Sequence, residues 1–356
     1  MIKKSKHIEI VRSSTKGFSS MSQVSCDAIF DVLSKYFTNV GVTVVNNLSD
    51  LEALASKQPD LVFLGMKFVP ANPKLGAKDP NKVWLSDYLD NKGIAYTGSS
   101  QVAHELERNK AMAKQRVFMA DLKTPEYCII ERNRTFSNDD LTINFPLFVK
   151  PANRGGGLGV DSDSVAHTFE QLQSKVHSIH TNLNSDALVE EYLTGREFSV
   201  AILKEEFSDK YCVMPIELIA PPDKNGYRML SSKVKSSNVE QVLAVCDGNV
   251  KYRVMSLAMN VFIALGARDY GRIDIRLDAD DKPNFLEANL IPSLISGYGS
   301  FPKACELNLG MDYESMIIRI TNLGLSYNED STGEALGVNK KNGNINFSNE
   351  AMFGQI

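Results

Sequence analysis

Strand-like and helix-like runs alternate through the first hundred residues, and this order limits the possible folds more than any other feature of the chain. Short apolar runs typical of strands lie at His7–Val11, Val42–Val45 and Leu61–Leu64. Between them, apolar residues recur at helical spacing over Ser22–Phe37 and Asp50–Ser56. A β-α-β-α-β order predicts a parallel sheet covered by helices. No GxGxxG motif follows the first strand, so the dinucleotide-binding fingerprint is absent.

The rest of the chain is predicted to mix strands and helices. The further strands expected are Tyr127–Ile130, Leu147–Lys150, Ala187–Glu190, Phe198–Leu203, Tyr211–Leu218, Arg272–Leu277 and Asn284–Asn289. The further helices expected are Trp84–Asn91, Gln101–Ala120, Phe169–Val176, Lys251–Leu265 and Lys303–Leu323. Phe68–Lys82 and Pro221–Gln241 are predicted as long loops, because they are rich in Pro, Lys or Ser.

Composition excludes several classes of protein. A chain of 356 residues suggests two or three domains. The net charge of −4 argues against binding to nucleic acid or to an anionic membrane by bulk charge. No apolar run approaches the length of a membrane span, and the run after the basic start is too short for a signal peptide. Five scattered cysteines without a CxxC pair indicate free thiols in a reducing cytoplasm.

Two strand-like segments near the C-terminus, Arg272–Leu277 and Asn284–Asn289, are separated by an Asp-rich linker and are expected to pair as a hairpin. Alternate residues of a strand share a face, so Arg272 and Asp274 lie on the same face of the first strand. The same rule puts Glu287 on the polar face of the second strand and Leu286 on its apolar face.

If Leu277 pairs with Asn284, Asp274 and Glu287 stand directly across the hairpin, with Cβ atoms about 5 Å apart, and repel each other unless a cation lies between them. Mg²⁺ is a hard cation that takes oxygen ligands and shares them with substrate phosphates. Arg272 would then stabilise charge on a transferring phosphoryl group. The alternative is an exposed hairpin whose polar face meets water. The apolar opposite face favours the metal site.

Two further stretches suggest a nucleotide. In Phe148–Gly159, Lys150 ends a strand and four glycines follow within five positions. Glycines let backbone N–H groups approach phosphate oxygens, although the spacing is not that of a Walker P-loop. In Leu188–Val200, strand-edge backbone groups can read an adenine edge, and a carboxylate can accept hydrogen bonds from ribose hydroxyls. A flexible loop and a solvated Glu-rich turn are the respective alternatives.

Taken together and in this order, these stretches resemble the ATP-grasp superfamily, and within it the D-alanine–D-alanine ligase family. The resemblance runs from about His7 to Leu325 and includes Tyr96–Ser99 and the Asn109–Lys110 pair. It implies an α/β, three-domain ATP-grasp architecture, in which a parallel α/β domain precedes two α+β subdomains that clamp ATP. The expected segments are an N-terminal domain (1–108), a small lid domain (109–195), a C-terminal domain with the metal and substrate site (196–326) and a polar tail (327–356).

The resemblance also implies roles for individual residues. Those assigned to ATP are Lys110 and Lys150 at the phosphates, the loop glycines Gly155, Gly156 and Gly157, Glu190, Tyr192 and Leu193 at adenine, Glu197 at the ribose, and Glu287. Mg²⁺, with Mn²⁺ as an alternative, is assigned to Asp274, Glu287 and Asn289. Arg272 would stabilise the acyl phosphate and the tetrahedral intermediate, and Lys233 would close over the γ-phosphate.

The chain departs from the family pattern in the amino-acid pocket. Gly156 stands where the family has a serine, Val234 where it has a tyrosine, Met21 near a glutamate position, and Tyr298 at a second serine position. A lysine-bearing insert with Lys67, Lys74 and Lys78 replaces an acidic loop, and these lysines could face an acidic or extended substrate. A site that has lost its polar anchors should reject the substrate that they bound.

Three functions follow as hypotheses. The first is an ATP-dependent carboxylate–amine ligase that forms an amide or dipeptide through an acyl phosphate, with altered acyl-substrate specificity. The second is a true D-alanine–D-alanine ligase of cell-wall synthesis. The third is a non-catalytic ATP-binding regulatory protein that recruits a partner through its tail. Small carboxylate and amine substrates and a cytoplasmic homodimer are expected for the enzyme, with no nucleic-acid or membrane partner.

Overall fold

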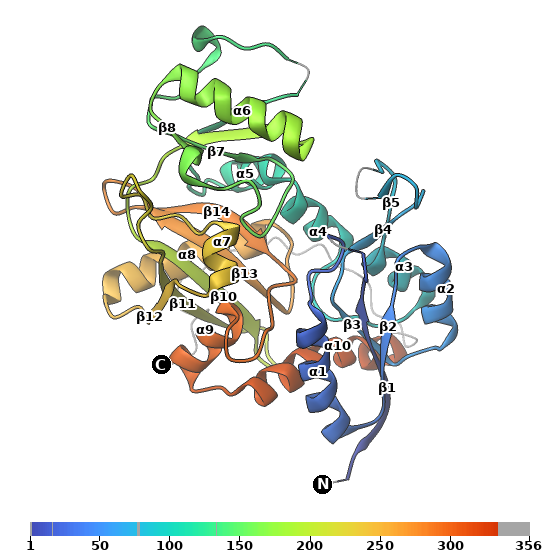
Figure 1. The fold of residues 1–356 in the computed structure, drawn as a ribbon. Coiled ribbons are helices and arrows are strands. Elements are labelled where there is room, and N and C mark those ends of the chain that lie inside the picture. The colour runs from blue at the N-terminus through green and yellow to red at the C-terminus, as the bar shows by residue number, and fades with distance from the viewer. Residues whose placement is uncertain (1, 16, 77–78, 133, 334–356) are drawn as a thin grey trace.

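The computed structural model describes all residues except 1, 16, 77–78, 133 and 334–356. In the described part, separate stretches of the chain build a three-stranded, a four-stranded and a five-stranded sheet, together with a two-stranded hairpin (Figure 1). No described helix is long and apolar enough to cross a membrane.

The N-terminal sheet is parallel, as the alternation predicted. Its strands lie in the order β2-β1-β3 and are β1 (Lys4–Arg12), β2 (Phe37–Val44) and β3 (Leu61–Leu64). Leu61 and Phe63 pack with α1 (Gln23–Tyr36) and α10 (Tyr313–Gly333), whereas Val62 and Leu64 pack with α2 (Leu48–Ser56) and α3 (Leu85–Lys92). All four side chains of β3 are buried because helices cover both faces of the sheet.

The predicted loop at Phe68–Lys82 is wrong at both of its ends. Phe68–Pro70 (β4) and Lys82–Trp84 (β5) pair as an antiparallel hairpin. The rings of Phe68 and Trp84 meet edge to face with centroids 5.3 Å apart, and Phe18 completes a small buried cluster. Aromatic packing across the two strands therefore holds a segment whose prolines suggested a loop.

The middle of the chain forms an antiparallel sheet with strand order β6-β9-β7-β8. Its elements are β6 (Tyr127–Ile130), β7 (Leu147–Pro151), β8 (Val165–Ala166), α6 (Phe169–Leu183) and β9 (Ala187–Glu191), with short 3₁₀ turns at Asn138–Asp140 and Ser162–Ser164. Val149 and Val189 pack under α6, which covers one face of the sheet (Figure 1). Because strand residues alternate, Lys150 and Glu190 are carried on the other face.

The C-terminal sheet is antiparallel with strand order β12-β11-β10-β13-β14. Its strands are β10 (Glu197–Lys204), β11 (Tyr211–Ile219), β12 (Gln241–Ala244), β13 (Tyr270–Leu277) and β14 (Pro283–Asn289). Apolar residues such as Phe198 and Ile273 pack with α8 (Gly248–Ala264) on one face. The opposite face carries Ser199, Arg272 and Asp274. The four-stranded sheet lies across from the five-stranded sheet (Figure 1).

The helix predicted over Gln101–Ala120 is interrupted. α4 (Gln101–Arg108) and α5 (Lys110–Met119) are separated by Asn109, whose backbone is extended (φ −101°, ψ 93°). The Asn109 side chain accepts a hydrogen bond from the Met112 N–H at 3.2 Å and so caps α5. A short polar side chain that bonds its own backbone starts a new helix where strong helix formers had suggested continuity.

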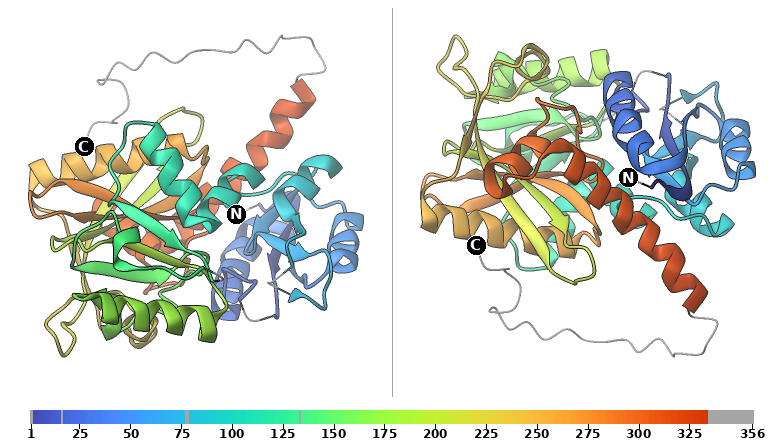
Figure 2. Two further views of the ribbon diagram at one scale, coloured as in Figure 1. Left: turned by 90° about the horizontal axis from the view of Figure 1, so that it is seen from above. Right: turned by 90° about the horizontal axis from the view of Figure 1, so that it is seen from below.

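The last predicted helix is also two helices. α9 (Ser300–Leu309) ends at Gly310, which has φ +61°, and α10 then runs to Gly333. Residues 327–333, predicted to begin a polar tail, instead continue α10, which projects past the sheets (Figure 2). The remainder of the predicted tail lies outside the described residues.

Candidate active site

The predicted hairpin sets Asp274 and Glu287 directly opposite each other in β13 and β14. The expected pairing of Leu277 with Asn284 is wrong by one residue, because Leu277 pairs with Pro283. A β-bulge at Leu286 restores the expected pairing, since Ile275 pairs with Phe285 and Asp274 with Glu287. The bulge also corrects the prediction for Leu286, which lines the cleft beside Glu287 instead of lying on the opposite face.

Asp274 is held by side chains from three strands. Its Oδ1 accepts hydrogen bonds from Ser199 Oγ (2.8 Å) and Arg272 Nε (3.0 Å). Its Oδ2 accepts from Arg272 Nη2 (2.9 Å) and from Asn289 Nδ2 (3.2 Å). Burial lowers the pKa of Arg272, but the charge of Asp274 and this paired contact outweigh burial and raise it. The guanidinium is therefore fixed and charged beside the carboxylate pair.

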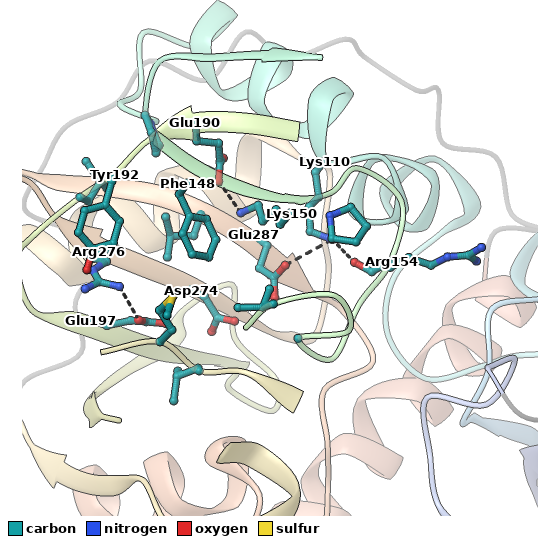
Figure 3. Close-up of a pocket in the computed structure, with 18 of the residues that line it drawn as sticks. Lys110, Phe148, Lys150, Arg154, Glu190, Tyr192, Glu197, Asp274, Arg276 and Glu287 are labelled. Carbon is teal, nitrogen blue, oxygen red and sulfur yellow. Dashed lines mark hydrogen bonds and ion pairs between the residues drawn. The ribbon is translucent and has the colours of Figure 1, made fainter. Parts of the chain in front are cut away.

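Glu287 lies among positive side chains. Its Oε2 is 3.5 Å from Lys110 Nζ, and Lys110 also donates to the backbone carbonyl of Arg154 (Figure 3). Burial alone would raise the pKa of Glu287, but the charges of Lys110, Lys235 and Lys150 outweigh burial and bring the pKa to about 2. Glu287 is therefore an ionised carboxylate at any ordinary pH.

Glu190 is completely enclosed between two lysines. Lys114 Nζ and Lys150 Nζ each lie 2.6 Å from one of its carboxylate oxygens. Lys114 was not among the predicted site residues. Burial lowers its pKa to about 8, and Glu190 opposes this effect. For Lys150, the charges of Glu190 and Glu287 outweigh burial and raise the pKa. The network ties α5 to the four-stranded sheet and fixes the Lys150 ammonium at the cleft.

An aromatic and charged cluster forms the other end of the cleft (Figure 3). The rings of Phe148 and Tyr192 stack with centroids 6.4 Å apart. The guanidinium of Arg276 lies over Tyr192 at 5.4 Å and donates to Glu197 Oε2 at 3.3 Å. Burial raises the pKa of Glu197, and Arg276 opposes this shift. Flat apolar surface beside a carboxylate suits a purine base and its ribose.

Most of the predicted site residues line a single cleft between the two sheets. They are Lys110, Lys150, Gly157, Glu190, Tyr192, Leu193, Glu197, Asp274 and Glu287. Arg272 and Asn289 do not line it but contact Asp274, and Gly155 and Gly156 lie in the adjoining glycine loop. Arg276, which sequence reasoning missed, follows Asp274 by two residues on the same face, and that spacing could have identified it.

The predicted catalytic lysine, Lys233, does not line the cleft in the structure. Within the segment predicted as a loop, Ser232–Ser237 forms a short helix, α7, capped by Ser231. Lys233 is exposed on this helix, whereas Lys235 lines the cleft. Tyr298 donates hydrogen bonds to the backbone carbonyl of Lys235 and to Glu240 Oε1, so the loop after β14 anchors this helix.

The glycine loop packs directly against the start of α7. Ser232 N donates to the Gly157 carbonyl at 3.2 Å, and a Cβ on Gly157 would lie 2.8 Å from both Leu230 O and Ser232 N. A Cβ on Gly156 would meet nothing within 4 Å, although both glycines have left-handed φ values of +67° and +74°. Only at Gly157 does a side chain collide with the facing backbone.

We expect Gly157→Ala to weaken this contact and to lower turnover about tenfold or more, because overpacking costs about 1–3 kcal/mol. Limited proteolysis within residues 221–238, measured together with ADP release, checks this. Gly156→Ala is the matched control, since it carries the same left-handed backbone without the collision. Equal effects of the two substitutions would assign the loss to backbone strain and contradict the packing explanation.

The donor set at the hairpin fits a hard cation that shares its ligands with phosphate. Asp274 and Glu287 supply carboxylate oxygens, and Asn289 adds an amide. No group of three or more His, Cys, Asp or Glu side chains that could hold a metal occurs among the described residues. A cation bound here would therefore need substrate oxygens to complete its shell, which is the usual arrangement for Mg²⁺.

The residues that depart from the family pattern lie in different surroundings. Met21 is buried against Gly65, and Gly156 leaves open space. Lys67 does not point freely into a pocket, because its ammonium is 2.6 Å from Glu107 Oε1. Lys74 is exposed, and Lys78 lies outside the described residues.

Comparisons with known proteins agree with this geometry. A model of the family described as "D-ala D-ala ligase C-terminus" matches residues 117–322. An uncharacterized protein of Sinorhizobium fredii, y4sG, is 32% identical over 64% of this chain and 66% of its own length. A D-alanine–D-alanine ligase of Desulfotalea psychrophila is 26% identical over 92% of this chain and 97% of its own. The structure of D-alanine–D-alanine ligase from Bacillus anthracis complexed with ATP has a TM-score of 0.70 and 19% identity, over 92% of this chain and all of that one.

The structural match confirms the predicted α/β ATP-grasp architecture. The family match covers more than half of the chain and spans Lys150, Glu190, the glycine loop and the carboxylate hairpin. The chain therefore belongs to the D-alanine–D-alanine ligase family and is an ADP-forming ATP-grasp ligase that forms carbon–nitrogen bonds.

Proposed function

We propose that this protein uses ATP to activate a carboxylate as an acyl phosphate and joins it to an amine, with an acyl-substrate specificity that differs from D-alanine. The observation that carries the proposal is the opposed Asp274–Glu287 pair, with Arg272 clamped to Asp274 and lysines around Glu287. Such an array suits the transfer of a phosphoryl group, in which catalysis consists mainly of positioning and charge stabilisation.

Under this proposal Mg²⁺, or Mn²⁺ in its place, is held by Asp274, Glu287 and Asn289. When bound, it supplies positive charge to the phosphate oxygens of ATP. Adenine and ribose occupy the end of the cleft formed by Tyr192, Leu193 and Glu197. This orientation directs the phosphates toward the lysine-rich end.

The lysines and Arg272 would stabilise negative charge on the phosphates and on the reacting groups. Lys110, Lys150 and Lys235 neutralise the phosphate chain, and their fixed positions avoid reorganisation during the reaction. The substrate carboxylate attacks the γ-phosphorus, the bond to the ADP oxygen breaks, and ADP leaves. The amine then attacks the acyl carbon and phosphate departs. Arg272 donates to the charge that develops at each of these steps.

Altered specificity is supported by the residues where the family places polar anchors. Met21 presents a buried thioether instead of a carboxylate. Gly156 has no side chain, and its φ of +67° strains any residue that has a Cβ. The hydroxyl of Tyr298 is committed to Lys235 and Glu240. A pocket that has lost these anchors should bind D-alanine less tightly than the family pattern does.

Two alternative functions are a true D-alanine–D-alanine ligase and a non-catalytic ATP-binding protein. The names of relatives such as the Desulfotalea psychrophila protein favour a true D-alanine–D-alanine ligase. A non-catalytic ATP-binding protein would have little need of a fixed, charged Arg272. We also propose domain boundaries at residues 108, 195 and 326, a homodimer and a cytoplasmic location.

The test is ADP release from a panel of carboxylic and amino acids, with hydroxylamine as a common amine that traps acyl phosphates as hydroxamates. We expect hydroxamate and ADP to form together with an acid larger or less polar than D-alanine. Efficient turnover on D-alanine alone, with a KM in the usual range of about 1 μM–1 mM, would restore the plain family activity. Absence of ADP release with every acid would contradict the ligase proposal itself.

A further inference from the structure

Three cationic side chains from different elements gather beside the glycine loop. Lys82 lies in β5, Arg108 ends α4, and Arg154 lies in the glycine loop. Arg108 and Lys82 both contact Phe68: the Arg108 guanidinium lies 4.7 Å and the Lys82 ammonium 5.5 Å from the Phe68 ring centroid. Within the described residues, none of the three cations takes part in an ion pair.

Arg108 has unused hydrogen-bonding capacity. It is partly buried, and its guanidinium donates no hydrogen bond to any described residue. Burial lowers its pKa, and the nearby charge of Arg154 lowers it further. A guanidinium held over an aromatic ring keeps its N–H groups available, and they can bind a planar anion in a bidentate manner.

Lys82 carries the same uncompensated charge. Burial lowers its pKa, and the charge of Arg108 adds to this effect. Asp79 is the carboxylate nearest to it in electrostatic terms, but Asp79 Oδ1 and Oδ2 accept backbone N–H groups from Asn81 (3.0 Å) and Asn72 (2.5 Å). Lys82 Nζ itself donates to the Asp79 carbonyl oxygen at 2.7 Å. No carboxylate oxygen of a described residue lies within ion-pair distance of Lys82 Nζ.

The cluster adjoins the catalytic cleft. Arg154 lines the cleft, and its backbone carbonyl accepts from Lys110. Its side chain extends away from Lys110 and Glu287 (Figure 3), and its Nη2 donates to Leu183 O at 2.9 Å. On the other side, Arg108 precedes Lys110 by two residues, and Lys110 lines the cleft with its Nζ 3.5 Å from Glu287 Oε2. A molecule activated beside Arg272 could therefore reach toward the three cations.

We propose that Lys82, Arg108 and Arg154 form an anion-binding subsite that takes a second acidic group of the acyl substrate, remote from the carboxyl group that is activated. The inference rests on the proposed ligase function. It names the substrate class as a dicarboxylic or phosphorylated acid. Uncompensated cations held in place without acidic partners are costly in the free protein, and a bound anion removes that cost.

The test compares acidic substrates with their neutral isosteres. ADP release with hydroxylamine is measured for aspartate against asparagine, glutamate against glutamine, and phosphoserine against serine, each as both enantiomers. We expect kcat/KM to favour the acidic member of at least one pair about tenfold or more, because a site built for a charged group rejects the analogue that lacks it. The phosphoserine pair distinguishes a phosphate subsite from a carboxylate subsite.

Arg108→Gln should collapse this preference to near unity and leave the KM for ATP unchanged. Arg116→Gln is the matched control, because Arg116 is exposed on the neighbouring helix α5. Lys82→Gln, in a different element, repeats the test if Arg108→Gln fails to fold. A wild-type enzyme that turns over neutral acids as well as acidic ones, or an Arg108→Gln variant whose only defect is a raised KM for ATP, would overturn the subsite. ADP release with no acid at all would instead reject the ligase function, and the subsite with it.

Discussion

Glu287→Gln is expected to lower turnover by on the order of 10²-fold or more, because it removes one of two carboxylates that hold a metal ion worth several kcal/mol to the transition state. The fold should persist, since Glu287 lies on the polar face of β14 and not in the core behind it. ADP release and thermal unfolding, measured on the same preparation, check both statements.

Asp280→Asn is the control for this substitution. Asp280 lies in the linker of the same hairpin, is exposed, and pairs only with Lys282. It should leave both turnover and stability close to wild type. A folded Glu287→Gln protein with near-normal turnover would contradict the proposed metal site and the mechanism built on it.

The low pKa of Glu287 predicts a pH dependence of the free energy of unfolding. Its pKa in the folded chain is about 2, below the ordinary value of 4.5, so its ionised form stabilises the fold. That contribution is present above about pH 4.5 and is lost as the pH falls toward 2. Glu287→Gln should therefore flatten this part of the stability profile, whereas Asp280→Asn should not.

Arg272→Ala is expected to bind ATP almost normally and to turn over more slowly by on the order of 10²–10³, the usual effect of losing one fixed donor to a developing charge. Arg276→Ala is the matched comparison, because Arg276 lies four residues further along the same face of β13. Arg276 contacts Tyr192 and Glu197, so its loss should raise the KM for ATP more than it lowers kcat.

Steady-state kinetics of the two arginine variants, with ATP affinity measured by calorimetry, separate these roles. If Arg272→Ala lost ATP binding in proportion to its lost turnover, Arg272 would be an anchor for the bound nucleotide and not a group that acts at the transition state. If both variants behaved alike, the assignment of opposite ends of the cleft to phosphate and adenine would be wrong.

Residues whose positions follow from strand alternation could be predicted from the sequence. The pairing of Asp274 with Glu287 and the common face of Arg272 and Asp274 follow from a period of two. The bulge at Leu286 could not be predicted, because an unpaired residue leaves the hydrophobic pattern almost unchanged while it shifts the register by one. The correct carboxylate pair was therefore reached from a wrong starting pair.

Lysines were harder to place than carboxylates. Lys233 and Lys235 stand two residues apart, and in a short helix only the three-dimensional position decides that Lys235 lines the cleft. Lys114 is fully buried, and contacts with Glu190, Thr124 and the Phe285 carbonyl, from distant parts of the chain, account for a charged residue there. Arg108 is placed in the proposed subsite by its contact with Phe68, which lies forty residues away in the chain. No local sequence pattern therefore identifies it.

The central claim is that a carboxylate is activated by phosphoryl transfer before it meets the amine. The most direct measurement follows ¹⁸O from a labelled substrate carboxylate, using an acid that supports ADP release. The account predicts that the inorganic phosphate released during turnover carries one ¹⁸O atom, because the carboxylate oxygen attacks the γ-phosphorus and leaves with the phosphate. Phosphate free of ¹⁸O, released in step with ADP and product, would contradict the acyl phosphate and the roles assigned to Arg272 and Glu287.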